Sequence, residues 1–133
     1  MGLPYGIANS TGIIPDDQIL DIFDTASLAG INLIDTAIAY GRAEEKIGLF
    51  AGNKFDIVTK LPANFKDEIN PINNLSNLVN ESLERLKTDK IYGLLLHRPH
   101  QLDEKGGLQI IEILNKLKIE GKVEKIGVSI YRP

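Results

Sequence analysis

Four short apolar runs recur along the chain, and segments with helical spacing lie between them. The runs begin near residues 31, 55, 91 and 123, and each is rich in apolar or β-branched side chains. Strands of this composition are typical of parallel sheets whose faces are covered by helices. The alternation of such strands with helical segments therefore predicts an α/β fold with a parallel sheet.

The expected strands cover residues 31–35, 55–61, 91–96 and 123–130. Helical segments are indicated by apolar side chains that recur on one face of a helix. One stripe is Leu75, Leu78, Val79, Leu83 and Leu86, and a second is Leu108, Ile111, Leu114 and Leu117. Off the first stripe lie Glu81, Glu84, Arg85 and Lys87, which we expect on a solvated face. Two further helices are expected between Pro15 and Gly30 and over residues 43–50.

The pattern of repeated βα units favours a barrel over a doubly wound nucleotide fold. No Gly-x-Gly-x-x-Gly follows the first strand, and the phosphate-loop motif is absent. A complete (β/α)₈ barrel needs about 250 residues, whereas this chain has 133. We therefore predict a partial (β/α)₈ barrel of roughly four βα units, with residues 1–133 forming a single domain.

Composition excludes several classes of function. The chain has no cysteine, so it has no disulfide, thiolate metal site or thiol nucleophile. A net charge of −3 without clustered basic residues argues against a nucleic-acid partner. No apolar run is long enough to span a membrane and no secretory signal is visible, so we expect a cytoplasmic protein. His97, His100 and Asp103 have loop spacing that a metal could use, but we expect no metal site.

Side chains that could take part in a reaction occur where the expected strands end. Asp35 ends the first strand, Lys60 lies near the end of the second and His97 follows the third. Tyr40 lies on the loop after the first strand. Because the carboxyl ends of parallel barrel strands form one rim, we expect these four side chains to converge. Taken singly, each has a simpler structural role, such as a turn-forming aspartate or a lysine that reaches solvent.

Together, the four side chains fit the reduction of a carbonyl group. An ammonium group favours the ionised form of a neighbouring phenol. A phenol placed in that way can act as a general acid toward a developing alkoxide. The hydride for such a reaction has to come from a cofactor.

Several motifs resemble those of the aldo-keto reductases. Asp35-Thr36-Ala37-x-x-Tyr40-Gly41-x-x-Glu44, followed by Gly48, resembles the first signature of that family. The family's later motifs are similar to three further segments, which are Thr59-Lys60, Leu95-Leu96-His97-Arg98-Pro99 and the segment from Gly121 to Ser129. Residues 5–9 and Thr11-Gly12 look like the opening loop of bacterial members. The resemblance covers nearly the whole chain, as the N-terminal half of the family's barrel.

The resemblance implies a catalytic tetrad of Asp35, Tyr40, Lys60 and His97, with Tyr40 as the acid. It also implies NADPH or NADH as the hydride donor and a small-molecule aldehyde or ketone as the substrate. Asp35 and Ser129 match cofactor-binding positions, and Ser129 would help to hold the nicotinamide amide. Ile130 stands where many members carry asparagine.

The alternative is a catalytically silent half-barrel that serves as a structural or assembly unit. The last expected strand, 123–130, has no following strand in this sequence, and apolar edges of that kind promote pairing with other chains. We therefore expect self-association through exposed sheet edges. On that interpretation, side chains such as Leu33, Ile57 and Leu95 face the open interior of the barrel.

Overall fold

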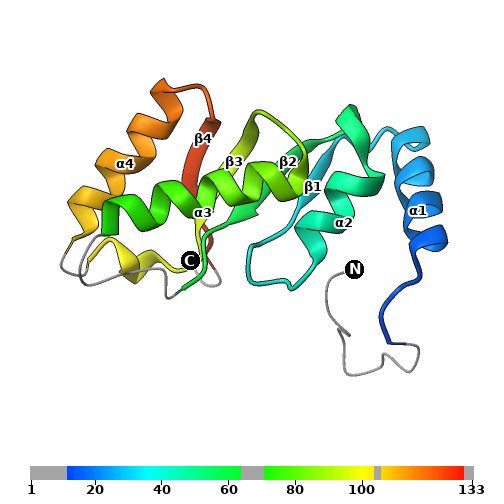
Figure 1. Ribbon diagram of the computed structural model, residues 1–133, viewed down its shortest axis with the longest axis horizontal. Helices are drawn as coiled ribbons and strands as arrows, with labels where there is room; N and C mark the ends of the chain where they lie inside the picture. The colour runs from blue at the N-terminus through cyan, green and yellow to red at the C-terminus, as the bar shows by residue number, and fades with distance from the viewer. Residues whose placement is uncertain (1–11, 64–70, 104–105, 131–133) are drawn as a thin grey trace.

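The computed structural model describes residues 12–63, 71–103 and 106–130. Its strands form one parallel sheet in the order β1-β2-β3-β4 (Figure 1). Their bounds are Leu33–Asp35 for β1, Asp56–Lys60 for β2, Ile91–Leu96 for β3 and Val123–Val128 for β4. All four predicted strands are present, and β1, β2 and β4 are shorter than predicted. The parallel α/β sheet is confirmed.

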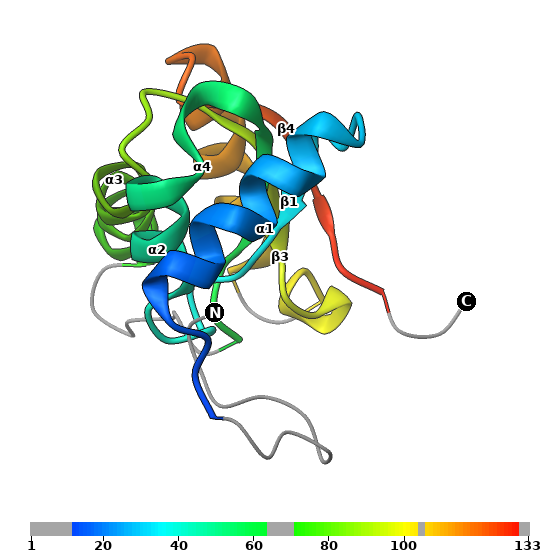
Figure 2. The same ribbon diagram turned by 90° about the vertical axis from the view of Figure 1, so that its right-hand side faces the viewer.

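A helix follows each of the first three strands along the chain, as a βα repeat requires. The α-helices are α1 (Asp16–Leu28), α2 (Ala43–Phe50), α3 (Pro71–Leu86) and α4 (Gly107–Ile119). Two short 3₁₀ helices, η1 (Gly52–Lys54) and η2 (Pro99–Gln101), lie in the connections. Helices α2, α3 and α4 cover one face of the sheet, and the opposite face carries no α-helix in the described part of the chain (Figures 1 and 2).

The hydrophobic core lies between the sheet and the helices. Its buried strand residues include Ile57, Ile91, Leu94, Leu96 and Val123. The prediction that Ile57 faces the open interior is wrong, because this side chain is buried against the helix layer. In the β1–β2 register Asp35 pairs with Val58, so Val58, rather than its neighbour Ile57, shares the face of Asp35.

The face away from the helices is partly open to solvent. Leu33 is 42% exposed, and both Val58 and Leu95 are half-buried and lie outside the core cluster. Lys60 pairs with Leu95 in the β2–β3 register, which places both on this same face. The interpretation of Leu33 and Leu95 as inward-facing barrel residues is thus consistent with their exposure.

Helix α4 lies where it was predicted, but only Leu114 and Leu117 of the four predicted stripe residues are buried. Leu108 is 78% exposed and Ile111 is also exposed, whereas Ile110, Ile113, Leu114 and Leu117 are buried. A helix turns about 100° per residue, so each step of three residues falls about 60° short of a full turn. Four side chains spaced by three therefore drift about 180° around the helix. The buried residues are spaced by three, then one, then three positions, so they stay on one side of the helix.

Helices α2 and α3 pack unusually closely where Gly48 meets the end of α3. A Cβ atom built on Gly48 would lie 2.2 Å from the carbonyl oxygen of Arg85 and 2.7 Å from the carbonyl carbon of Leu86. Both atoms belong to the backbone, so they cannot turn away as a side chain can. The absence of a side chain at Gly48 thus allows α2 to approach α3.

In the described residues no helix is long and apolar enough to cross a membrane.

Gly48→Ala should destabilise the protein by about 1–3 kcal/mol, because the added methyl group forces α2 and α3 apart. The higher helix propensity of alanine offsets this loss only in part. Gly127→Ala is the matched control, because its Cβ would meet only the mobile end of Leu95, at 3.1 Å. Urea unfolding measures both changes. An equal or smaller loss for Gly48→Ala would contradict the close packing.

Candidate active site

The carboxyl ends of the four strands lie at one edge of the sheet, the lower edge in Figure 1. Asp35 and Lys60 are the last residues of β1 and β2. His97 follows β3 directly, and Ser129 follows β4 rather than lying within it. The backbone N–H of Ser129 donates to the carbonyl oxygen of Leu96 at 2.9 Å, which continues the parallel ladder beyond β4.

Lys60 is the buried charge of this edge, with 6% of its surface exposed. Its Nζ donates to Oδ2 of Asp35 at 2.5 Å and to the carbonyl oxygen of Thr36 at 2.9 Å. A buried ammonium group is costly unless it is paired and hydrogen-bonded, and these two acceptors supply that pairing. Asp35 lies opposite Val58, two residues before Lys60 on the same face of β2, so strand register brings the two charges together.

Tyr40 lies over this ion pair. Its backbone N–H donates to the carbonyl oxygen of Ala37 at 3.0 Å, and Gly41 takes a positive φ of 60° that closes the turn. Nζ of Lys60 lies 5.6 Å from the centre of the Tyr40 ring, within the range of a cation–π contact. The tyrosine is 37% exposed. The structure thus brings Asp35, Lys60 and Tyr40 together at an edge that solvent reaches.

His97 occupies the next strand end and is half-buried. The loop that follows it is tied to the loop after β2 by Gln101, which is 1% exposed. Oε1 of Gln101 accepts from the backbone N–H of Arg98 at 3.0 Å. Its Nε2 donates to the carbonyl oxygen of Ala63 at 3.2 Å. Gln101 thus fixes the spacing of the two loops that flank Lys60 and His97.

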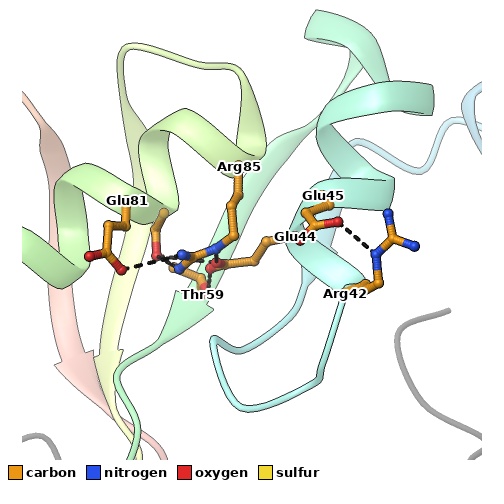
Figure 3. A network of polar contacts seen from close by, with 7 residues as sticks. Arg42, Glu44, Glu45, Thr59, Glu81 and Arg85 are labelled. Carbon is orange, nitrogen blue, oxygen red and sulfur yellow. Dashed lines mark hydrogen bonds and ion pairs between the residues drawn. The ribbon is translucent and has the colours of Figure 1, made fainter.

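Glu44 forms a second buried polar cluster on the helix side of β2 (Figure 3). It is 2% exposed, and it accepts hydrogen bonds from Thr59 Oγ1 at 2.7 Å and from Arg85 Nε at 2.8 Å. Arg85 is therefore not a purely solvated residue as predicted, because a buried carboxylate draws its guanidinium inward. Neither this cluster nor Gln101 was predicted from the sequence. Only the place of Glu44 in the first signature motif hinted at it.

Arg42 lies two residues after Tyr40, directly before α2, and pairs with the first turn of that helix. Its Nε donates to Oε2 of Glu45 at 2.7 Å. This hydrogen bond and the charge of Glu45 raise the pKa of the Arg42 guanidinium above its ordinary value. Figure 3 shows the pair on the opposite side of α2 from Glu44.

Metal ligands are not grouped in residues 12–63, 71–103 and 106–130. No cluster of three or more His, Cys, Asp or Glu side chains there could hold a metal ion. His100 is exposed in η2. The candidate site is therefore a set of proton-bearing and charged side chains.

The family model for the aldo/keto reductases matches residues 3–133. The chain belongs to the aldo/keto reductase family. Two similar curated proteins are both methylglyoxal reductase DkgB. The protein from Escherichia coli O157:H7 is 30% identical over 124 residues, and that from Yersinia pestis is 32% identical. Each match covers 87% of this chain and 44% of the relative, so the chain spans less than half the length of these proteins.

Solved structures of the family share the fold. A Pseudomonas aeruginosa protein assigned to the aldo-keto reductases superposes with a TM-score of 0.79 at 30% identity, covering 96% of this chain and 51% of that one. A Klebsiella pneumoniae aldo-keto reductase, solved in complex with NADPH, has a TM-score of 0.70 at 27% identity. That match covers 87% of this chain and 40% of the other. The predicted partial (β/α)₈ barrel is confirmed.

Asp35→Asn should lower the free energy of unfolding by about 1–2 kcal/mol, because it leaves a buried ammonium group without its counter-charge. The figure is modest because the side chain of Asp35 is 57% exposed. Lys60→Met should also destabilise the chain, whereas the double variant should lose less than the sum of the two. A double-mutant cycle by urea unfolding measures this coupling. Additive losses would mean that the pair does not contribute.

Proposed function

We propose that this chain carries the proton-transfer groups of an NAD(P)H-dependent oxidoreductase that reduces an aldehyde or ketone to an alcohol. The observation that supports it is the Lys60 ammonium group, held by Asp35 beneath the ring of Tyr40. This arrangement occurs at the strand-end edge of a chain that belongs to the aldo/keto reductase family. In barrels of this kind the reacting groups lie at that edge.

Each of the four residues has a distinct task in the proposal. Tyr40 donates its hydroxyl proton to the substrate oxygen as that oxygen becomes an alcohol. The positive charge of Lys60 stabilises the phenolate that remains. Asp35 fixes Lys60 in place and offsets the cost of burying its charge. His97, at the end of the neighbouring strand, orients the carbonyl oxygen.

The residues at this edge fit a nicotinamide cofactor, which we propose to be NADPH or NADH. The Ser129 hydroxyl is both a donor and an acceptor, and the Asp35 carboxylate is an acceptor, which suits a carboxamide. When bound, the cofactor supplies the hydride. The Klebsiella pneumoniae relative was solved with NADPH, which makes NADPH the first choice to test. DkgB is named for methylglyoxal, so methylglyoxal is a suitable first substrate.

Tyr40→Phe should abolish most carbonyl reduction when the chain is joined to the second half of a family barrel. The change removes the proton donor and little packing volume, and general acid catalysis is worth roughly 10²–10⁴ in rate. Steady-state assays with NADPH and methylglyoxal measure kcat. Cofactor affinity should stay unchanged, which a fluorescence titration checks. An undiminished kcat would assign the proton to another group.

A second candidate role is that of an assembly unit, and the open face of the sheet favours it. Leu33 is 42% exposed on that face, and Ile130 beyond β4 is 69% exposed. Unpaired strand edges and apolar faces are templates for pairing with another chain. A second copy of the chain could cover both.

The 133-residue chain expressed alone should self-associate and should show no turnover as a monomer. Burial contributes roughly 25 cal/mol per Å² of apolar surface, so covering the open face favours association. Sedimentation velocity at micromolar concentration measures the oligomeric state, and an NADPH assay measures turnover. A stable soluble monomer would contradict the first expectation, and clear turnover by that monomer the second.

A further inference from the structure

The buried carboxylate of Glu44 lies outside the proposed chemistry, yet it joins the chain segments that carry it. Glu44 belongs to the first turn of α2, four positions after Tyr40 in the sequence. Thr59, which donates to Oε1 of Glu44, is the residue before Lys60 on β2. Glu44 therefore connects the element that begins just after Tyr40 with the strand that ends in Lys60.

The two faces of β2 explain how one strand serves both sites. Successive side chains of a strand point to opposite faces. Thr59 is fully buried on the helix side, where it meets Glu44, whereas Lys60 points to the other face and meets Asp35. A shift of α2 along the sheet would thus be opposed at Thr59, immediately beside the anchor of the ammonium group.

Helix α3 closes the cluster from its other side. Oε2 of Glu44 accepts from Arg85 Nε at 2.8 Å and from Ser82 Oγ at 3.2 Å. Ser82 is fully buried, and the side chain of Arg85 is 28% exposed. Three elements thus converge on one carboxylate, and the close contact at Gly48 holds the same two helices one turn further along.

The Tyr40 turn is short enough to transmit this restraint. The backbone N–H of Ala43 donates to the carbonyl oxygen of Tyr40 at 3.2 Å, so the turn passes directly into α2. The N–H of Ile38 donates to the carbonyl oxygen of Lys60 at 3.1 Å, which holds the other end of the turn to β2. The position of the phenol over Lys60 therefore depends on where α2 begins.

We propose that Glu44 is a positioning residue that sets the place of Tyr40 relative to Lys60 through the Thr59 and Arg85 contacts. The inference rests on the proposed function for its catalytic meaning, but the placement itself can be measured without activity. A buried ion pair is weak evidence for stability, and in some proteins such a pair specifies one arrangement of the elements that it joins. A small misplacement of a reacting group costs up to about 10²-fold in rate.

Hydrogen exchange followed by mass spectrometry of the full 133-residue chain tests the placement. Glu44→Gln keeps the size of the side chain but removes its charge, and Thr59→Val removes the direct link to β2 while it keeps the Glu44–Arg85 pair. Both variants should accelerate exchange in peptides covering residues 38–46, by about 10-fold or more for Glu44→Gln. Peptides from α4 and β4 should keep their original rates.

Two controls separate positioning from general destabilisation. Glu81→Gln neutralises the exposed carboxylate that lies 3.5 Å from Nη1 of Arg85, leaves the contacts of Glu44 intact and should leave residues 38–46 unchanged. Leu114→Ala creates a cavity on the distant helix α4 and should accelerate exchange without selecting the Tyr40 segment. The proposal would be overturned if residues 38–46 exchanged at the wild-type rate in both Glu44→Gln and Thr59→Val. It would also be overturned if exchange in these variants accelerated as uniformly as in Leu114→Ala.

Joined to the second half of a family barrel, the Glu44→Gln variant should lose roughly 10- to 100-fold in kcat with an unchanged KM for NADPH. A merely structural role would instead lower the fraction of folded enzyme without altering the kcat of the folded molecules. If the unmodified barrel reduces no carbonyl, the proposed function fails, while the exchange measurement still decides whether Glu44 places the Tyr40 turn.

Discussion

Burial of the Lys60 ammonium group is the constraint on which the candidate site depends. Lys60 has only 6% of its surface exposed, and burying an ammonium group is costly unless acceptors lie close by. Asp35 and the carbonyl oxygen of Thr36 are those acceptors, and both come from the end of β1. The β1–β2 register and the backbone turn after Asp35 must therefore be correct before the charge is tolerated. The same geometry brings the ring of Tyr40 within 5.6 Å of that charge.

Much of this arrangement could be predicted from the sequence because it depends on local pattern. Apolar strands separated by helical stripes predict parallel strand ends at one edge, and Asp35, Lys60 and His97 each stand at such an end. The contact between Asp35 and Lys60 follows from strand register, which depends on the alternation of side chains along the strands. The catalytic roles themselves remain predictions.

The residues that were missed have partners distant in the chain. Arg85 lies off an apolar stripe and has the pattern of a surface residue, yet it meets a carboxylate 41 positions earlier. Gln101 contacts the carbonyl oxygens of Pro62 and Ala63, which lie 39 and 38 positions earlier in the chain. No local sequence pattern predicts such a contact. Ile57 was misplaced for another reason, since the adjacent apolar residues Ile57 and Val58 do not reveal which face of the strand is covered. Leu108 and Ile111 of α4 were misjudged because a run spaced by threes was taken for a stripe.

The candidate site divides into a part that two neighbouring strands and the turn after the first supply, and a part that needs more of the barrel. Asp35, Tyr40 and Lys60 come from β1, its turn and the adjoining β2, and their contacts are complete within those elements. His97 and Ser129 stand at the ends of later strands, and the sheet face between them is open to solvent. A barrel excludes water by closing that face, and electrostatic stabilisation is strongest in a site from which water is excluded. The proton-transfer geometry can therefore form in this chain, while the dry environment that makes it effective depends on whatever covers the open face.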